Sequence, residues 1–180
     1  MDCKLLEQQL NQLPLYQYAF LQPDELPFSE RVQQVCRQEC PMYGKSWSCP
    51  PAVGSVEACR ARCLNFDHAL LLVTVQEVAD SSNLELTLTT KPVHNELVHQ
   101  VELLLQAQGC STLTLSADAC ARCDACTYPD SPCRHPNLQT PCLEGYGIVV
   151  SDLAERCGVP FPPEMNLVYW YACILFSGKD

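Results

Sequence analysis

The sequence predicts an α/β fold: a single layered domain in which helices pack on a mixed sheet and two cysteine-rich loops bind metal. Three observations support this prediction. Apolar segments with the spacing of strands alternate along the chain with segments that have the spacing of helices. The 180 residues suit one domain, so we treat residues 1–180 as a single metal-binding domain. Fourteen cysteines are present, and eight of them fall within residues 36–51 and 120–142.

The first half of the chain is expected to alternate short helices with strands. Residues 2–13 carry leucines near helical spacing and predict a short amphipathic helix. The segment LYQYAFL at 15–21 predicts a short strand, and a helix over 55–64 is capped by its first serine. HALLLVTV at 68–75 is typical of a buried strand. Within 84–90 leucines alternate with polar residues, which predicts a half-exposed strand.

The second half continues the alternation. Its clearest helix covers residues 92–109, beginning with proline and closing with glycine. STLTLSA at 111–117 predicts a strand that leads straight into the second cysteine loop. IVVSDLAERCG at 148–158 has helical spacing, and NLVYWYACILF at 166–176 predicts a final buried strand. Because strands and helices alternate, we expect the cysteine loops to follow strand ends.

The cysteines indicate metal binding rather than cross-linking. The N-terminal segment is polar and lacks the continuous apolar stretch of a signal peptide. The longest strongly apolar run, residues 69–73, is far too short to cross a bilayer, so no membrane association is expected. We therefore expect a cytoplasmic location. In that reducing compartment clustered cysteines bind metal more often than they form disulfides.

The charge of the chain excludes one class of partner. A formal net charge of -10 argues against nucleic-acid binding, which needs a basic surface. Seven of the eleven Lys and Arg residues nevertheless fall within residues 31–63 and 120–135, together with only four of the 21 acidic residues. Cations thus gather near the cysteines, where they would stabilise the negative charge of metal-bound thiolates. Ordinary scatter of surface charges explains the same distribution equally well.

The second cysteine loop has the spacing C-x2-C-x2-C-x6-C, formed by Cys120, Cys123, Cys126 and Cys133. Three thiols at two-residue gaps wrap a loop around one compact centre, and bacterial ferredoxins use such a run to hold a [4Fe–4S] cluster. A zinc site is the alternative, because paired C-x2-C spacing also suits Zn²⁺. The spacing favours the iron–sulfur cluster over Zn²⁺.

The first loop supplies three cysteines, Cys36, Cys40 and Cys49, with the spacing C-x3-C-x8-C. Prolines after two of them hold the chain extended. The fourth ligand remains open at this point. It is Cys59 on the following helix, or Cys142, or it is missing and leaves one iron free. We expect one or two [4Fe–4S] clusters in the whole chain, most simply two.

Other residues of the two loops are expected to surround the metal. Tyr43 and Trp47 are apolar covers that would keep water from a cluster. Lys45 and His135 are candidate polar helpers, and Arg134 adds a cation beside the second loop. None of these residues has an assigned catalytic role.

Three motifs occur in order between about Arg31 and Gly158: C-P-x-Y-G-x-x-W-x-C-P-P, C-x2-C-x2-C-T-Y-P-D-x-P-C-R-H-P and P-x-L-E-G-Y-G-I. Together they resemble the bacterial and archaeal "predicted metal-binding proteins", a family of unknown function common in anaerobes. The resemblance implies metal binding by the seven cysteines of the two loops and implies no reaction. This sequence departs from the family pattern at Cys142, where a serine is common.

Three functions are compatible with these observations. The first is a soluble iron–sulfur protein that passes electrons to a redox partner protein. The second is an iron–sulfur enzyme with an open iron at Cys36, Cys40 and Cys49, acting on a small molecule that the sequence does not identify. The third is a protein-interaction module stabilised by Zn²⁺.

Overall fold

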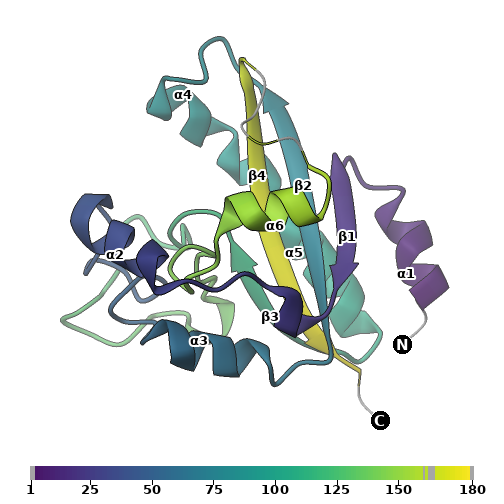
Figure 1. The fold of residues 1–180 in the computed structure, drawn as a ribbon, viewed down its shortest axis with the longest axis horizontal. Coiled ribbons are helices and arrows are strands. Elements are labelled where there is room, and N and C mark those ends of the chain that lie inside the picture. The colour runs from purple at the N-terminus through teal and green to yellow at the C-terminus, as the bar shows by residue number, and fades with distance from the viewer. Residues whose placement is uncertain (1–2, 160, 162–164, 179–180) are drawn as a thin grey trace.

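The computed structural model describes residues 3–159, 161 and 165–178. A four-stranded sheet forms its middle layer, and helices lie on both faces (Figure 1). The elements, in chain order, are α1 (Cys3–Leu10), β1 (Gln17–Leu21), the 3-10 helix η1 (Pro23–Glu25), α2 (Glu30–Glu39), α3 (Val56–Cys63), β2 (His68–Glu77), α4 (Leu84–Thr89), α5 (Lys91–Ala107), β3 (Ser111–Ser116), the 3-10 helix η2 (Pro136–Leu138), α6 (Val150–Arg156) and β4 (Leu167–Ser177). The α/β class and the layered arrangement are confirmed.

The sheet has the strand order β1-β2-β4-β3, and all three ladders are antiparallel. The expected mixed sheet is therefore wrong in one respect. The β2-α5-β3 unit does place β2 and β3 in the same direction, since both run antiparallel to β4. The last strand, β4, lies between β2 and β3 and pairs with each. Because β2 and β3 are not neighbours, the sheet contains no parallel ladder.

The two central strands are buried on both faces. On β2, Leu70 and Leu72 contact the layer formed by α1 and α5, whereas Leu71 and Val73 belong to the core cluster that includes residues of α3 and α6. Both sets have no exposed surface. Burial on both faces explains why β2 is a continuous apolar run instead of an alternating one. Among the described residues, no helix combines the length and apolar character that spanning a bilayer requires.

Residues 84–90 form helix α4 and its C-cap, not the expected strand. The Asn83 side chain accepts hydrogen bonds from the backbone N–H groups of Glu85 (3.0 Å) and Leu86 (3.2 Å), which starts a helix. The alternating leucines of this segment remain exposed, with 67% exposure at Leu84. Alternation alone does not make a strand, because this segment pairs with no strand of the sheet.

The expected first cysteine loop, residues 36–51, begins inside a helix. Ser29 caps α2 by accepting a hydrogen bond from the Arg31 N–H (3.3 Å), and Cys36 lies in the last turns of this helix. Cys40 is the C-cap. Helix α2 has no buried residue, so it offers no apolar stripe by which the sequence could reveal it.

A buried histidine gives this fold a specific pH dependence. His94 on α5 has no exposed surface, and its Nδ1 lies 2.9 Å from Thr74 Oγ1. Burial lowers the pKa of His94 to about 4 from an ordinary value of 6.5. The unfolded chain therefore binds more protons than the folded chain between these pH values. Stability that is complete above pH 6.5 is lost as the pH falls toward 4.

We predict that lowering the pH from 7 to 5 reduces the free energy of unfolding of the wild type by about 2 kcal/mol more than that of His94→Gln. Urea unfolding of both proteins at each pH measures this difference. Any overall destabilisation by the substitution cancels, because only the pH dependence is compared. Parallel pH profiles would contradict the assignment of a neutral His94.

Candidate metal centre

The two cysteine segments converge at one end of the molecule. Helix α2 and the long loop after β3 lie together on the left of the view in Figure 1, next to the end of β3. Residues 46–49 of the first segment contact Cys120 and Cys126 of the second, and we call them the bridging segment. Cysteines far apart in the sequence are thereby gathered into two neighbouring groups.

The first group, which we call site A, consists of Cys36, Cys40, Cys49 and Cys142. Burial, followed by the neighbouring thiol of Cys40, raises the pKa of Cys36 to about 11, and Glu144 and Cys49 add to this effect. The Cys142 thiol donates a hydrogen bond to Cys49, which lowers the pKa of Cys49 to about 7 and raises that of Cys142. The thiols are thus close enough to influence one another's ionisation.

Cys142 is held in site A by backbone contacts on both sides. Its N–H donates to the Ser48 carbonyl (3.3 Å), and its Sγ accepts a hydrogen bond from the Gly145 N–H (3.1 Å). Gly145 has to be glycine, because a Cβ at this position would lie 2.6 Å from Cys142 Sγ and 3.2 Å from Pro50 Cδ. The turn after Cys142 therefore fixes the position of its sulfur.

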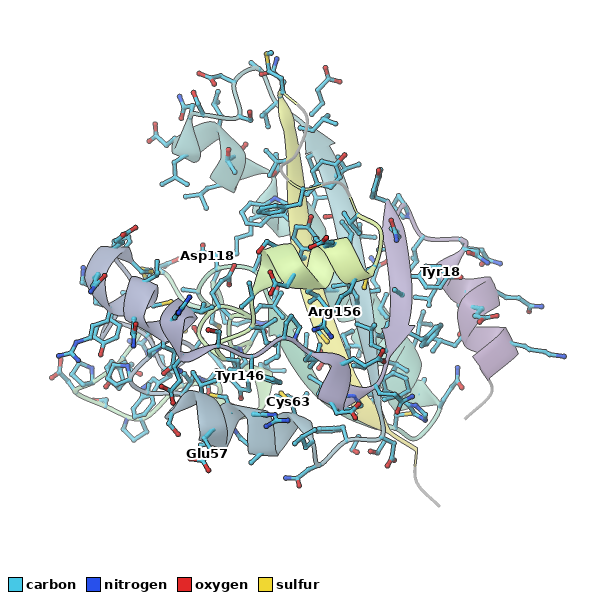
Figure 2. The ribbon with its side chains drawn as sticks, viewed as in Figure 1. Tyr18, Glu57, Cys63, Asp118, Tyr146 and Arg156 are labelled. Carbon is cyan, nitrogen blue, oxygen red and sulfur yellow. The ribbon has the colours of Figure 1, made fainter. Side chains whose placement is uncertain are left out.

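Cys59, the other candidate for a fourth ligand, lies in the core of the domain. Its Sγ lies 3.5 Å from the Val53 carbonyl, to which it donates, and it accepts a hydrogen bond from Arg62 Nη2 (3.0 Å). It packs with Cys63 and Tyr146 in the apolar cluster that covers the sheet, a region visible in Figure 2. The structure thus brings Cys142, and not Cys59, next to Cys49.

The second group, which we call site B, consists of Cys120, Cys123, Cys126 and Cys133. All four line one hollow of about 30 Å³. Trp47, Arg122, Arg134 and His135 line the same hollow. The four cysteines of the C-x2-C-x2-C-x6-C loop therefore border the same hollow, with the cations Arg122 and Arg134 beside them.

Backbone N–H groups point at the sulfur of Cys126. The Trp47 N–H lies 3.4 Å from Cys126 Sγ. Burial alone would raise the pKa of Cys126, but hydrogen bonds from the backbone of Tyr128 and Trp47, with smaller contributions from Ser46 and Thr127, lower it. Such N–H···S bonds stabilise a thiolate, which is the form that binds metal.

The bridging segment connects the two sites through one hydroxyl group. Ser48 Oγ accepts a hydrogen bond from the Cys120 N–H (2.9 Å) and lies 3.7 Å from Cys49 Sγ. Ser46 Oγ in turn lies 2.8 Å from Ser48 Oγ, and both serines are buried. One serine side chain therefore separates a cysteine of site A from the first cysteine of site B.

Lys91 fixes the start of the site B loop. Its Nζ donates to Asp118 Oδ2 (2.9 Å) and to the Ala119 carbonyl (2.7 Å), and the residue is only 7% exposed. Asp118 has a φ of 60°, which turns the chain out of β3 toward Cys120. A buried ammonium thus holds the two residues that precede the loop.

Of the other residues expected around the metal, some contact the site B loop and others lie away from it. Trp47 joins the two loops, because its Nε1 donates to the Ser131 carbonyl (3.0 Å) and its ring packs edge-on against Tyr128 at 4.9 Å. Arg134 donates to the Ala125 carbonyl (2.8 Å) within the site B loop. Tyr43 lines a shallow groove beside α2, and Lys45 is exposed and lines neither site.

The side chains of both sites are thiols, which as thiolates are ligands of zinc and of iron–sulfur clusters. Each site offers four cysteines, and among the described residues thirteen cysteines are free thiols. Four thiolates suit either Zn²⁺ or a [4Fe–4S] cluster. Within the described ranges, no group of three or more His, Cys, Asp or Glu side chains is arranged to hold a single metal ion.

A family model described as "Predicted metal-binding protein" matches residues 19–176. The chain belongs to this family. The match includes every cysteine of sites A and B, together with the four strands except the first two residues of β1 and the last residue of β4. The family thus supports metal binding and leaves the identity of the metal open. No curated protein and no solved structure matches the chain.

Three residues beside the sites were not anticipated from the sequence. They are Ser48, Lys91 and Glu144. The Oε2 atom of Glu144 is buried without a hydrogen-bond partner among the described residues, and burial raises the pKa of this carboxyl. The sequence could have indicated Glu144, because it follows Cys142 by two residues. No local pattern distinguishes Ser48 and Lys91, because their roles depend on contacts across the fold.

We predict that Cys142→Ser removes the metal of site A, whereas Cys59→Ser retains it. Cys142 lies against Cys49, and Cys59 is engaged with Arg62 in the core. Metal content per chain of the two purified variants measures the difference, with circular dichroism as a check of folding. Equal metal loss in both variants would contradict the placement of the fourth ligand.

We also predict that Gly145→Ala lowers the metal content of site A, because the added Cβ displaces Cys142 Sγ. Gly178→Ala is the matched control, since a Cβ there meets nothing within 4 Å. Metal analysis of both variants after identical purification tests the prediction. Full metal content in Gly145→Ala would show that metal binding at site A does not depend on the position of the Cys142 sulfur.

Proposed function

We propose that the protein carries two [4Fe–4S] clusters, one at each site, and transfers electrons between them and a redox partner protein. All eight donors of sites A and B are thiols, which is the ligand set of such clusters. The N–H···S contacts at Cys126 are of the kind that tune cluster potential.

The observation that carries the proposal is the position of Ser48 between the two sites. Its hydroxyl contacts the Cys120 N–H and lies 3.7 Å from Cys49 Sγ. A second link runs from the Trp47 N–H to Cys126 Sγ. Clusters held by these cysteines would be neighbours separated by one short segment, an arrangement suited to passing an electron from one centre to the next.

Charge supports the same function. Arg122 and Arg134 border site B, where positive charge stabilises the reduced, more negative state of a cluster. The chain as a whole has a formal net charge of -10. An acidic exterior favours docking to a basic partner protein and accelerates their encounter. The free thiols and the proposed clusters agree with a reducing compartment such as the cytoplasm.

Site A favours electron transfer over an open-iron enzyme. An enzyme of that kind would hold its cluster by three cysteines and leave the fourth iron for substrate. Here Cys142 donates a hydrogen bond to Cys49, so a fourth thiol is present beside the other three. A cluster with four protein ligands has no free iron for a substrate.

Zinc at site B is a second candidate, because four cysteines also suit Zn²⁺ and the hollow that they line is small, about 30 Å³. Residues 120–135 contain no helix or strand. In this candidate function, Zn²⁺ would stabilise the loop of a protein-interaction module.

Anaerobic purification of the full chain, followed by metal and sulfide analysis and electron paramagnetic resonance, tests the proposal. We predict about eight irons and about eight sulfides per chain. We also predict that the reduced protein shows magnetic interaction between two centres, which disappears in Cys142→Ser. Stoichiometric zinc with no sulfide would contradict the proposal and support the structural alternative.

A further inference from the structure

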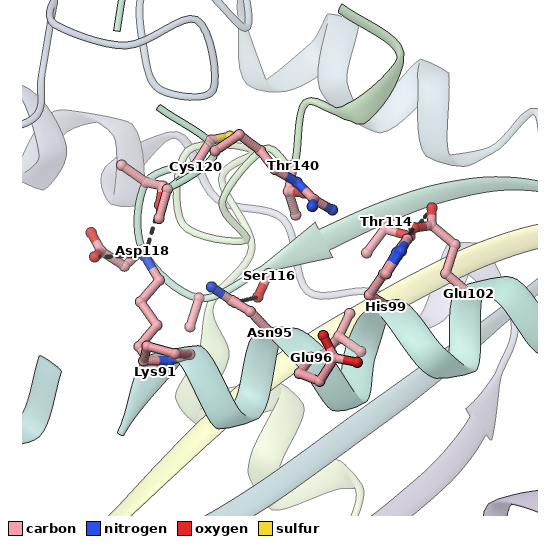
Figure 3. A pocket seen from close by; sticks show the side chains of 16 residues that line it. Lys91, Asn95, Glu96, His99, Glu102, Thr114, Ser116, Asp118, Cys120 and Thr140 are labelled. Carbon is pink, nitrogen blue, oxygen red and sulfur yellow. Dashed lines mark hydrogen bonds and ion pairs between the residues drawn. The ribbon is translucent and has the colours of Figure 1, made fainter. Parts of the chain in front are cut away.

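A cavity of about 270 Å³ lies between α5, the end of β3 and the start of the site B loop (Figure 3). Most of its lining residues belong to α5 and β3, and the rest follow β3. Asn95 stands in the middle of the lining, and Ser116 Oγ donates to its Oδ1 (3.4 Å). The amide nitrogen of Asn95 has no partner among the described residues. A polar donor is thus available inside the cavity.

The cavity and site B share a wall. Cys120 and Arg122 line both the cavity and the hollow formed by the four cysteines of site B. A molecule in the cavity would therefore contact residues that also border site B. Its volume is slightly below the range of about 300–1,000 Å³ that accommodates drug-sized ligands, so the occupant is small.

The lining carries charges of both signs. Arg122 is exposed at the mouth and has no ion pair or hydrogen bond within the described part of the chain, whereas Lys91 is already engaged by Asp118. Glu96 and Glu102 line the α5 side, where Gln100 donates to one oxygen of Glu96 (3.0 Å) and Thr114 to one oxygen of Glu102 (2.7 Å). The carboxylates disfavour a multiply charged anion, and Arg122 disfavours a simple cation. A molecule with one group of each sign satisfies both ends.

We propose that this cavity binds a small zwitterion of amino-acid size, with its carboxylate against Arg122 and its ammonium group facing Glu96 and Glu102. Asn95 contributes a hydrogen bond between the two ends. Binding depends on α5 and β3 and does not require metal. An effect of the bound molecule on a cluster at site B rests on the function proposed above.

Isothermal titration calorimetry of the full chain with each of the standard L-amino acids tests binding. We expect at least one to bind with one site per chain, and its carboxamide, which lacks the anionic group, to bind about tenfold more weakly or worse. Absence of binding by every amino acid, or equal binding of the carboxamide, would overturn the proposal.

Two variants locate the binding site. Asn95→Leu fills the cavity and removes the amide, so we expect it to abolish binding. Val93→Leu is the matched control on the same helix, because Val93 is 49% exposed and does not line the cavity. Glu96→Gln changes an exposed charge at little risk to folding, and we expect about tenfold weaker binding. Undiminished binding in Asn95→Leu and Glu96→Gln would place the ligand elsewhere.

A spectroscopic readout separates this inference from the proposed function. Iron and sulfide are measured on the same samples. In iron-loaded protein we expect the bound amino acid to shift the electron paramagnetic resonance signal of site B, and this shift to be absent in Asn95→Leu. Binding to a protein that holds only zinc would support the cavity while rejecting the iron–sulfur function. Binding without a shift in iron-loaded protein would overturn the link to site B.

Discussion

The contact of the Ser48 hydroxyl with both cysteine loops is the constraint on which the arrangement of the two sites depends. This hydroxyl accepts the N–H of Cys120 and lies beside Cys49 Sγ, while the Ser48 carbonyl accepts the N–H of Cys142. One residue therefore positions cysteines from three separate parts of the chain. Because Ser48 is fully buried, water does not compete for these hydrogen bonds.

The antiparallel sheet supplies the frame for this contact. Insertion of β4 between β2 and β3 places β3 at the sheet edge, and the chain leaves β3 directly into the site B loop. Lys91, at the start of α5, holds that exit through Asp118 and Ala119. The same helix and strand form the cavity beside site B, so the fold places a metal loop and a ligand cavity on one shared wall.

Apolar patterns predicted the elements with buried faces, because burial selects apolar residues: a stripe at helical spacing in α5 and continuous apolar runs in β2 and β4. They failed for α2, which buries no residue, and for α4, whose leucines alternate without a strand partner. The order of the strands depends on pairing across the whole chain, which local patterns do not encode. For the site, spacing grouped the four cysteines of site B, and all four line one hollow. Which thiol lies next to Cys49 could not be predicted, because tertiary contacts bring Cys142 close to Cys49 and place Cys59 in the core.

Anomalous X-ray diffraction from crystals of the anaerobically purified full chain, recorded on both sides of the iron and zinc absorption edges, locates and identifies the bound metals. We predict two iron peaks on opposite sides of Ser48, one surrounded by Cys36, Cys40, Cys49 and Cys142 and the other by Cys120, Cys123, Cys126 and Cys133. Peaks at the zinc edge alone, or iron bound away from these eight sulfurs, would contradict it.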